Sequence, residues 1–157
     1  MSDQKQAYEF DNIDKGILNA LMEDAKTPYT RIAQNIFVSD GTVHVRMKKL
    51  EQAGVVSGSR LIVDYNKLGY DLTAYIGIYL EKGSAYKEVI AKMEEIPEIV
   101  EAHYITGAYS IFSKIICKNT DHLRQILNNQ IQAIDGIRRT ETFISLENSI
   151  QRAIRLK

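Results

Sequence analysis

The chain has 157 residues, a single cysteine and a formal net charge of zero at pH 7. One cysteine excludes an intrachain disulfide and fits a reducing, cytoplasmic compartment. The sequence has no apolar run near the roughly 20 residues that a membrane-spanning helix needs, and we expect neither a membrane segment nor a signal peptide.

The charges are unevenly distributed along the first part of the chain. Residues 1–30 carry three lysines against six acidic residues, whereas residues 31–60 carry five basic residues against two acidic ones. A local excess of positive charge is what a nucleic-acid-binding segment needs, even in a neutral protein. Residues 31–60 are therefore the candidate DNA-binding region.

Apolar residues at helical spacing predict two helices near the N-terminus. The first covers residues 12–24. Thr27 is the expected N-cap of the second helix, with Pro28 tolerated at its first position. The buried side of this second helix is expected to include Ile32 and Ile36.

A third helix is expected to begin after an N-cap at Ser39, to run to about Ala53 and to stop at Gly54. The segment Val55–Val63, with Gly58 in its middle, is typical of a two-stranded wing. Helix, tight turn, helix and wing together predict a winged helix-turn-helix, whose usual partner is double-stranded DNA.

The second half of the chain contains a weak internal repeat. Met93 and Ile99 of the first copy correspond to Ile131 and Ile137 of the second, and each copy is typical of a strand, a helix and a strand. Two such units predict a βαββαβ, ferredoxin-like sandwich, so the chain as a whole is of the α+β class. The expected strands are residues 74–80, 99–106, 111–118 and 138–146.

Such a sandwich leaves one face of its sheet without helices, because both right-handed crossovers lie on the same side. On the first strand, Tyr75, Gly77 and Tyr79 point to this open face. An aromatic open face favours a protein interface, and we expect a homodimer that packs sheet to sheet through these three residues. The alternative is a monomer whose tyrosines are half exposed.

The third helix of the first half has two faces. Val43, Met47 and Leu50 form the expected core stripe. The opposite, outward stripe is Gly41, His44, Val45 and Lys48. His44 can bind a base edge or a phosphate, and Val45 can contact a thymine methyl group. Lysines and arginines nearby suit phosphates, and the helix N-terminus can also donate to one. The residues expected to meet DNA are Ser39, Asp40, Gly41, Thr42, His44, Val45, Arg46, Lys48, Lys49 and Arg60.

Several of these residues have a simpler interpretation. Lys48 and Lys49 taken alone would be a solvated helix face, and His44 taken alone would be a surface histidine. Arg46 lies beside the core stripe, where an ion pair within the domain is as good an expectation as a contact with DNA. The arrangement inside a winged helix-turn-helix favours the DNA interpretation for Thr42, His44, Val45 and Lys48.

The segment Leu50–Val56, preceded by Ser39-x-x-Thr42-Val43-x-x-Arg46-Met47, resembles the signature of the Lrp/AsnC family, the feast/famine transcriptional regulators. Residues 97–102 and 106–110 resemble the signatures of that family's ligand-sensing domain. The resemblance covers roughly residues 11–150, with the motifs in the family's order.

The resemblance implies a DNA-binding domain at 1–63, a linker at 64–72 and an effector-binding and dimerisation domain at 73–157. It implies homodimers that assemble into tetramers or octamers, and an amino acid or related metabolite bound between dimers. No cofactor is implied beyond such an effector. The effector would contact a turn formed by Thr106, Gly107, Ala108, Tyr109 and Ser110.

The chain departs from the family pattern at two places. Phe37 stands where the helix-turn-helix turn usually has glycine. A bulky residue at this position is either strained at a positive φ or forces a different turn. Ala108 and Ser110 leave the sensing loop without the family's usual carboxylate, so its effector is expected to be changed, weakened or absent. Alternatively, Gly107 and Ser110 only shape a turn.

Two other functions compete with that of a regulator. Siroheme decarboxylases share this two-domain fold by resemblance, but the histidines and arginines of the second half show no focus for a tetrapyrrole. A partner subunit that no longer binds DNA is the other alternative, supported by Phe37. The histidines and Cys117 lack the spacing of metal ligands, and the sequence predicts a protein that is not an enzyme.

Overall fold

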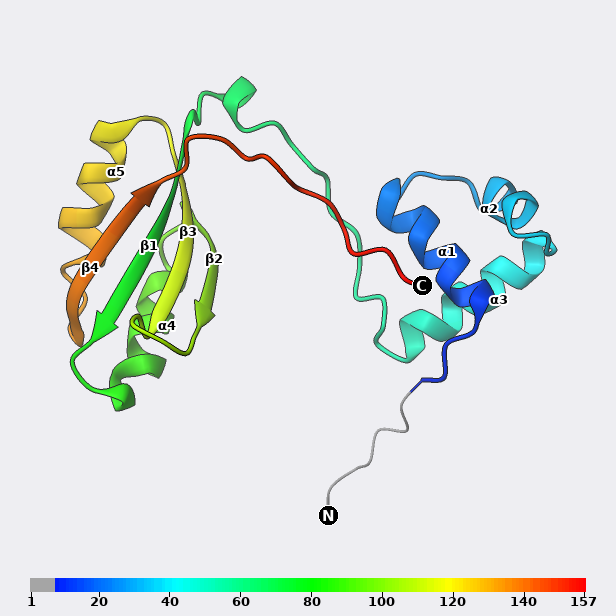
Figure 1. The fold of residues 1–157 in the computed structure, drawn as a ribbon, viewed down its shortest axis with the longest axis horizontal. Coiled ribbons are helices and arrows are strands. Elements are labelled where there is room, and N and C mark those ends of the chain that lie inside the picture. The colour runs from blue at the N-terminus through cyan, green and yellow to red at the C-terminus, as the bar shows by residue number, and fades with distance from the viewer. Residues whose placement is uncertain (1–7) are drawn as a thin grey trace, which may run out of the picture. The chain divides into compact units, whose positions relative to one another are not determined.

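The chain forms two compact units in the computed structural model, which describes residues 8–157 (Figure 1). Among the described residues, the helical unit comprises 8–61 together with 150–157, and the sheet unit comprises 62–149. This division differs from the expected one, because residues 150–157 group with the first domain. Residues 1–7, where the expected first domain begins, lie outside the described residues.

The helical unit is built from α1 (Asn12–Glu23), α2 (Tyr29–Asn35) and α3 (Asp40–Gln52). Their facing apolar side chains form one small core. Its buried members are Ile17, Leu18, Ile32, Ala33, Val43, Met47 and Leu50. The three helices and the core faces predicted from periodicity are therefore confirmed.

Helix α2 begins later than the sequence suggested. Its N-cap is Pro28, which makes no side-chain capping bond, so the prediction of Thr27 as N-cap was wrong. The backbone N–H of Thr27 instead donates to the carbonyl oxygen of Asp24 at 3.0 Å, in the turn that follows α1. By contrast, Ser39 caps α3 as predicted, and its hydroxyl accepts from the Thr42 N–H.

The predicted wing strands are absent. The described residues between α3 and the first strand contain no strand, but only a short 3₁₀ turn at Asn66–Leu68. Leu61 and Ile62 are 77% and 88% exposed, and of the segment 55–63 only Val56 packs against the helical core, so the segment has no continuous buried apolar face. A two-stranded ribbon is at best marginally stable in water without such a face.

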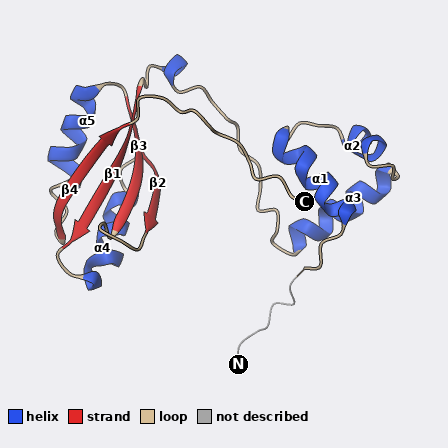
Figure 2. Ribbon diagram, in the orientation of Figure 1, coloured by secondary structure: helices blue, strands red, loops and turns tan. Residues whose placement is uncertain are grey.

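The sheet unit contains four antiparallel strands in the order β2-β3-β1-β4, with α4 (Tyr86–Glu94) and α5 (Thr120–Ile126) packed against them (Figure 2). A π turn at Leu127–Ile131 continues α5. This is the predicted βαββαβ, ferredoxin-like arrangement. The strands are β1 (Leu72–Leu80), β2 (Ile99–Tyr104), β3 (Ile111–Cys117) and β4 (Ile137–Ile144).

The two faces of β1 differ as its alternation predicted. Ala74, Ile76 and Ile78 are fully buried in the core that includes Val89 of α4 and Ile126 of α5. Both helices thus cover one face of the sheet, and the side chains between these positions belong to the other face.

Residues 150–157 are tied to the helical unit by hydrogen bonds to one side chain. The Asn19 amide nitrogen donates to the carbonyl oxygen of Leu156 at 3.0 Å, and the Leu156 N–H donates to the Asn19 oxygen at 2.9 Å. The Leu156 side chain packs against the helical core. One amide therefore pairs with the extended backbone much as a neighbouring strand would.

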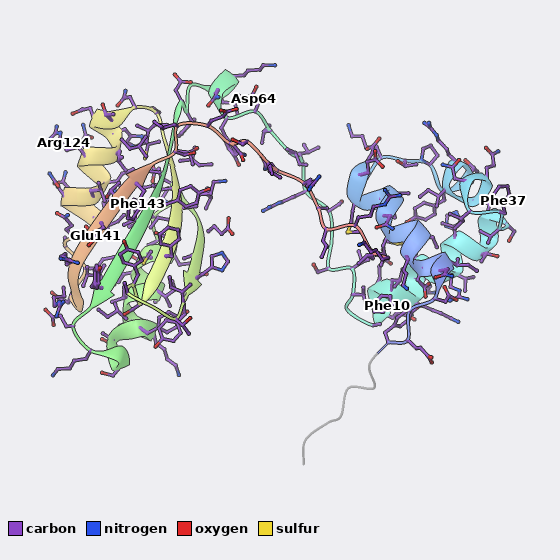
Figure 3. All side chains as sticks on the ribbon, in the orientation of Figure 1. Phe10, Phe37, Asp64, Arg124, Glu141 and Phe143 are labelled. Atoms are coloured by element: carbon purple, nitrogen blue, oxygen red, sulfur yellow. The ribbon has the colours of Figure 1, made fainter. Side chains whose placement is uncertain are left out.

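The turn between α2 and α3 holds Phe37 at φ 58°, with its side chain 95% exposed (Figure 3). A non-glycine residue in the left-handed region costs about 1–3 kcal/mol. Glycine would remove this cost, but its greater freedom in the unfolded chain offsets part of the gain. We expect Phe37→Gly to raise the free energy of unfolding of the helical unit by about 1 kcal/mol, measured by chemical denaturation.

The matched control is Phe37→Ala, which removes the exposed ring but keeps the Cβ atom that makes this conformation unfavourable. The control should leave the free energy of unfolding nearly unchanged. Equal stabilisation by alanine and glycine would mean that the exposed ring, and not the backbone conformation, lowers the stability.

Candidate nucleic-acid interface

Helix α3 separates a buried stripe from an exposed one. Val43 and Leu50 have no exposed surface, whereas Val45 is 56% exposed and His44 and Lys48 are also exposed. An exposed valine on a polar helix face suits apolar contact in a DNA groove. The outward stripe predicted from the sequence is therefore present as a continuous surface.

The N-terminus of α3 is arranged by its own side chains. The Ser39 hydroxyl oxygen accepts from the Thr42 N–H at 3.1 Å and lies 2.8 Å from the Thr42 hydroxyl. Asp40 lies in the first turn, with its carboxylate 3.9 Å from His44 Nε2. The Asp40 carboxylate would repel a phosphate at this helix end. A phosphate contact in the first turn is therefore disfavoured, whereas the outward stripe remains suited to base contacts.

Arg46 belongs to an ion pair that joins α3 to α1. Its guanidinium lies 2.8 Å from the Asp11 carboxylate and 3.3 Å from that of Asp14, which has no exposed surface. The Tyr8 hydroxyl and the Asp11 N–H also donate to Asp14, each at 3.3 Å. The geometry thus favours the bracing alternative for Arg46, whose guanidinium is occupied by these carboxylates.

The same cluster depends on pH. The Asp14 N–H, which donates to the Asp11 carboxylate, and secondarily the Arg46 guanidinium lower the pKa of Asp11 below its ordinary value. A lowered carboxyl pKa contributes stability that is present above the unfolded pKa and is lost as the pH falls through the folded pKa. The Asp11 contribution is therefore complete at neutral pH.

The other basic residues predicted to meet phosphates are exposed. Lys48 and Lys49 lie on α3, and Arg60 lies in the extended segment after it. None of the three forms a salt bridge within residues 8–157 in this structure. Their charges are thus available to a polyanion.

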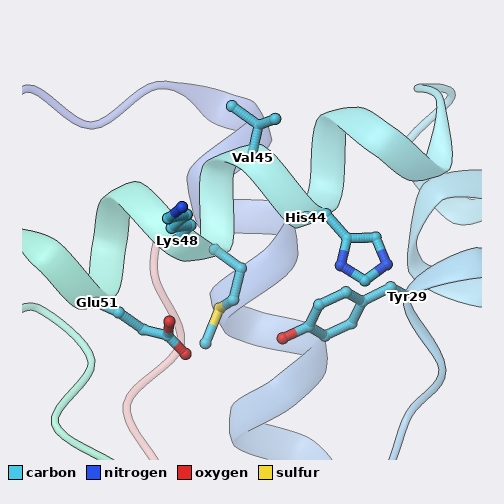
Figure 4. A pocket seen from close by; sticks show the side chains of 6 residues that line it. Tyr29, His44, Val45, Lys48 and Glu51 are labelled. Atoms are coloured by element: carbon cyan, nitrogen blue, oxygen red, sulfur yellow. The ribbon is translucent and has the colours of Figure 1, made fainter.

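Sequence reasoning missed one residue at this surface, Tyr29 at the start of α2. Its ring lies against that of His44, and the two belong to the wall of a hollow of about 450 Å³ beside α3 (Figure 4). The hollow is lined by Tyr29, His44, Val45, Met47, Lys48 and Glu51. The one signal for Tyr29 was its place at the start of α2, where it packs against the helical core.

The open face of the sheet carries a cluster of aromatic rings. Tyr75 stacks on Phe112 with centroids 5.8 Å apart, and Tyr109 lies 6.1 Å from Phe143. A Cβ atom at Gly77 would lie 2.5 Å from carbon atoms of the Tyr109 ring. Gly77 is therefore covered by its own chain, while the rings around it form the outer surface of this face.

A carboxylate organises the polar edge of this cluster (Figure 3). Glu141 accepts from the hydroxyl of Tyr109 at 2.7 Å and from that of Tyr79 at 3.2 Å. Arg139 donates to Glu141 at 2.7 Å and lies 4.3 Å from the centre of the Tyr79 ring. Tyr79, predicted on the open face, is thus part of a hydrogen-bonded network, and so is Tyr109, which the sequence analysis assigned to the effector turn.

The predicted effector loop is a turn between β2 and β3. Gly107 has φ 109°, and the Ser110 N–H donates to the carbonyl oxygen of Ile78 at 2.9 Å. Thr106 and Ala108 are exposed, whereas Tyr109 turns onto the open face of the sheet. The loop therefore presents small and polar groups to solvent, while its aromatic residue belongs to the sheet.

No group of histidine, cysteine and acidic side chains suited to a metal ion occurs within the described part of the chain. Within residues 8–157, no helix has both the length and the apolar character needed to cross a bilayer.

A DNA-binding helix-turn-helix joined to a ferredoxin-like domain defines a class of regulators that couple DNA binding to a ligand. Comparison with family models bears this out: residues 10–57 match "Winged helix-turn-helix DNA-binding" and residues 73–154 match "Lrp/AsnC ligand binding domain". The chain belongs to the Lrp/AsnC family of transcriptional regulators.

Individual relatives agree with this assignment. The regulatory protein AsnC of Escherichia coli K12 is 47% identical over 148 residues, which cover 94% of this chain and 97% of that protein. The structure of E. coli AsnC covers 95% of this chain and all of its own, with a TM-score of 0.89 at 46% identity. These relatives are regulators and not enzymes.

A transcriptional regulator from Neisseria meningitidis, solved as an L-Met complex, shares the fold. It has a TM-score of 0.88 at 18% identity, with 95% of this chain and 97% of that chain covered.

Removing Arg46 should destabilise the helical unit. Arg46→Met keeps much of the aliphatic length but leaves the buried Asp14 carboxylate without its cation, and breaking a buried pair costs about 3 kcal/mol or more. Because Arg46 is itself 29% exposed, we expect a loss of about 2–3 kcal/mol in chemical denaturation at pH 7. The double variant Arg46→Met/Asp14→Asn should recover part of the loss, and no recovery would contradict the ion-pair explanation.

The hydrogen bond to Glu141 and, secondarily, burial raise the pKa of Tyr109 from its ordinary value to about 12. A raised phenol pKa contributes stability that is present below the unfolded pKa and is lost as the pH rises through the folded pKa. With ring-labelled tyrosine in NMR, we expect one resonance to titrate near pH 12 and to disappear in Tyr109→Phe. Glu141→Gln removes the charge and should move this titration towards 10; an unchanged titration would exclude Glu141 as the cause.

Proposed function

We propose that the protein is a sequence-specific regulator that reads DNA with the outward stripe of α3. The observation that supports this most is the exposure of Val45 beside His44 and Lys48 on a helix whose opposite side is the core. In this proposal His44 and Val45 contact base edges, while Lys48, Lys49 and Arg60 contact phosphates.

We further infer that the protein acts as a homodimer built through the open face of the sheet. The supporting observation is the cluster of Tyr75, Tyr109, Phe112 and Phe143, since Phe143 is 45% exposed in the single chain. An apolar, aromatic face of this kind is typical of a protein interface. Dimers would place two copies of α3 on one DNA duplex, and association into tetramers or octamers would follow the family's pattern.

The effector of this regulator is proposed to be an amino acid or a related metabolite. The support is the family of the second domain, and the Neisseria relative that was solved with L-Met. Because Ala108 and Ser110 supply no carboxylate, an effector with an extra positive charge should bind poorly at the turn 106–110. An effector changes DNA binding to the extent that it binds two assembly states unequally.

Fluorescence anisotropy tests the function as a whole. The full-length protein is titrated against a duplex from upstream of its own gene and against random duplex, with and without a pool of amino acids. We expect preference for the upstream duplex, and a shift of that preference with the pool. Preference without a shift would remove the amino-acid effector from the proposal, and no preference would favour the partner-subunit alternative.

The roles of the α3 residues are separable with single variants. His44→Ala and Val45→Ala should each cost about 1–3 kcal/mol on the specific site and much less on random DNA, because they lose base contacts. Lys48→Ala should weaken both duplexes alike and reduce the salt slope by about 1. Lys87→Ala, an exposed lysine of α4, is the control and should change neither. Equal losses on both duplexes for all three α3 variants would contradict these roles.

A further inference from the structure

Tyr29 and His44 form an aromatic contact between two helices. The ring centroids lie 4.7 Å apart and the planes are inclined at 65°, so that one ring meets the other edge to face. Tyr29 is the first residue of α2, and His44 lies in the outward stripe of α3. This contact joins the two helices of the helix-turn-helix on the side that carries the outward stripe (Figure 4).

The two partners are held very differently. Tyr29 is half buried and packs against the core of the helical unit, whereas the His44 side chain is 63% exposed. The tyrosine ring is therefore the anchored member, and the histidine is the member whose orientation depends on the contact. An exposed histidine on a helix otherwise exchanges freely between rotamers.

A second side chain lies near the His44 ring, beyond hydrogen-bonding distance. The Asp40 carboxylate, one helical turn earlier, lies 3.9 Å from Nε2. Tyr29 and His44 also line the hollow of about 450 Å³ beside α3. Removal of the Tyr29 ring would enlarge this hollow next to His44, and the imidazole would gain orientations that the tyrosine now excludes.

We propose that Tyr29 is a specificity-determining residue of the DNA interface, which acts by holding the His44 imidazole in the orientation that meets a base edge. This inference rests on the proposed function of His44. A hydrogen bond to a base edge requires a defined direction from the donor or acceptor. A ring fixed before binding loses less conformational freedom on the DNA, so the contact is stronger on the correct sequence.

Two substitutions of Tyr29 separate the ring from its hydroxyl. Tyr29→Leu keeps an apolar side chain against the core but removes the aromatic edge, and Tyr29→Phe keeps the ring. In anisotropy titrations with the full-length protein, we expect Tyr29→Leu to weaken binding to the upstream duplex roughly two- to tenfold relative to random duplex. Tyr29→Phe should bind both duplexes like the unmodified protein.

The same substitution in a His44→Ala background tests the mechanism. If Tyr29 acts through His44, Tyr29→Leu should cause no further loss of discrimination in that background. An equal loss with and without His44 would overturn the inference, and so would a loss in Tyr29→Phe that matches the loss in Tyr29→Leu. If His44→Ala lowers discrimination and Tyr29→Leu does not, only this inference fails; if His44→Ala has no effect, the proposed function of His44 fails with it.

A measurement without DNA checks the contact directly. The ring protons of His44 should show a ring-current shift in NMR spectra of the unmodified protein and of Tyr29→Phe, and this shift should disappear in Tyr29→Leu. Circular dichroism of each variant confirms that the helices are intact. A shift that persists in Tyr29→Leu would show that Tyr29 does not orient His44, and would overturn the inference.

Discussion

The helical unit depends on one buried carboxylate. Asp14 has no exposed surface, and a charge removed from water is tolerable only when it is paired and hydrogen-bonded. Its cation, Arg46, lies on α3, so the pair fixes how α3 is rotated about its own axis against α1. That rotation directs Val43 into the core and Val45 outward. The face proposed to meet DNA is thus oriented by an interaction on another side of α3.

A different constraint governs the sheet unit. Because both helices cover the same side of the sheet, the other side must satisfy its aromatic residues with contacts of its own. The chain uses Tyr109 for this purpose, since its ring covers Gly77 and its hydroxyl binds Glu141. The predicted sensing turn and the predicted dimer face therefore share this residue, and a ligand that moved the turn would also disturb the sheet surface.

Periodicity was sufficient to predict the helices, the four strands and both faces of α3, because burial of a stripe leaves a regular trace in the sequence. The wing failed because Leu61 and Ile62 are apolar yet exposed, so their pattern resembled a strand without one being formed. The contacts of Tyr29 and Glu141 could not be predicted, because each joins two elements whose distance from one another cannot be read from the sequence. The return of Leu156 to the helical unit left no local signal either.

That return has a consequence for how the protein is made. The sheet unit is interposed between two parts of the helical unit, so the ribosome completes residues 62–149 before it adds the segment that pairs with Asn19. During synthesis the sheet unit can acquire all of its own contacts first. The DNA-reading unit reaches its final packing last, when the ligand-binding domain to which it is coupled has already been translated.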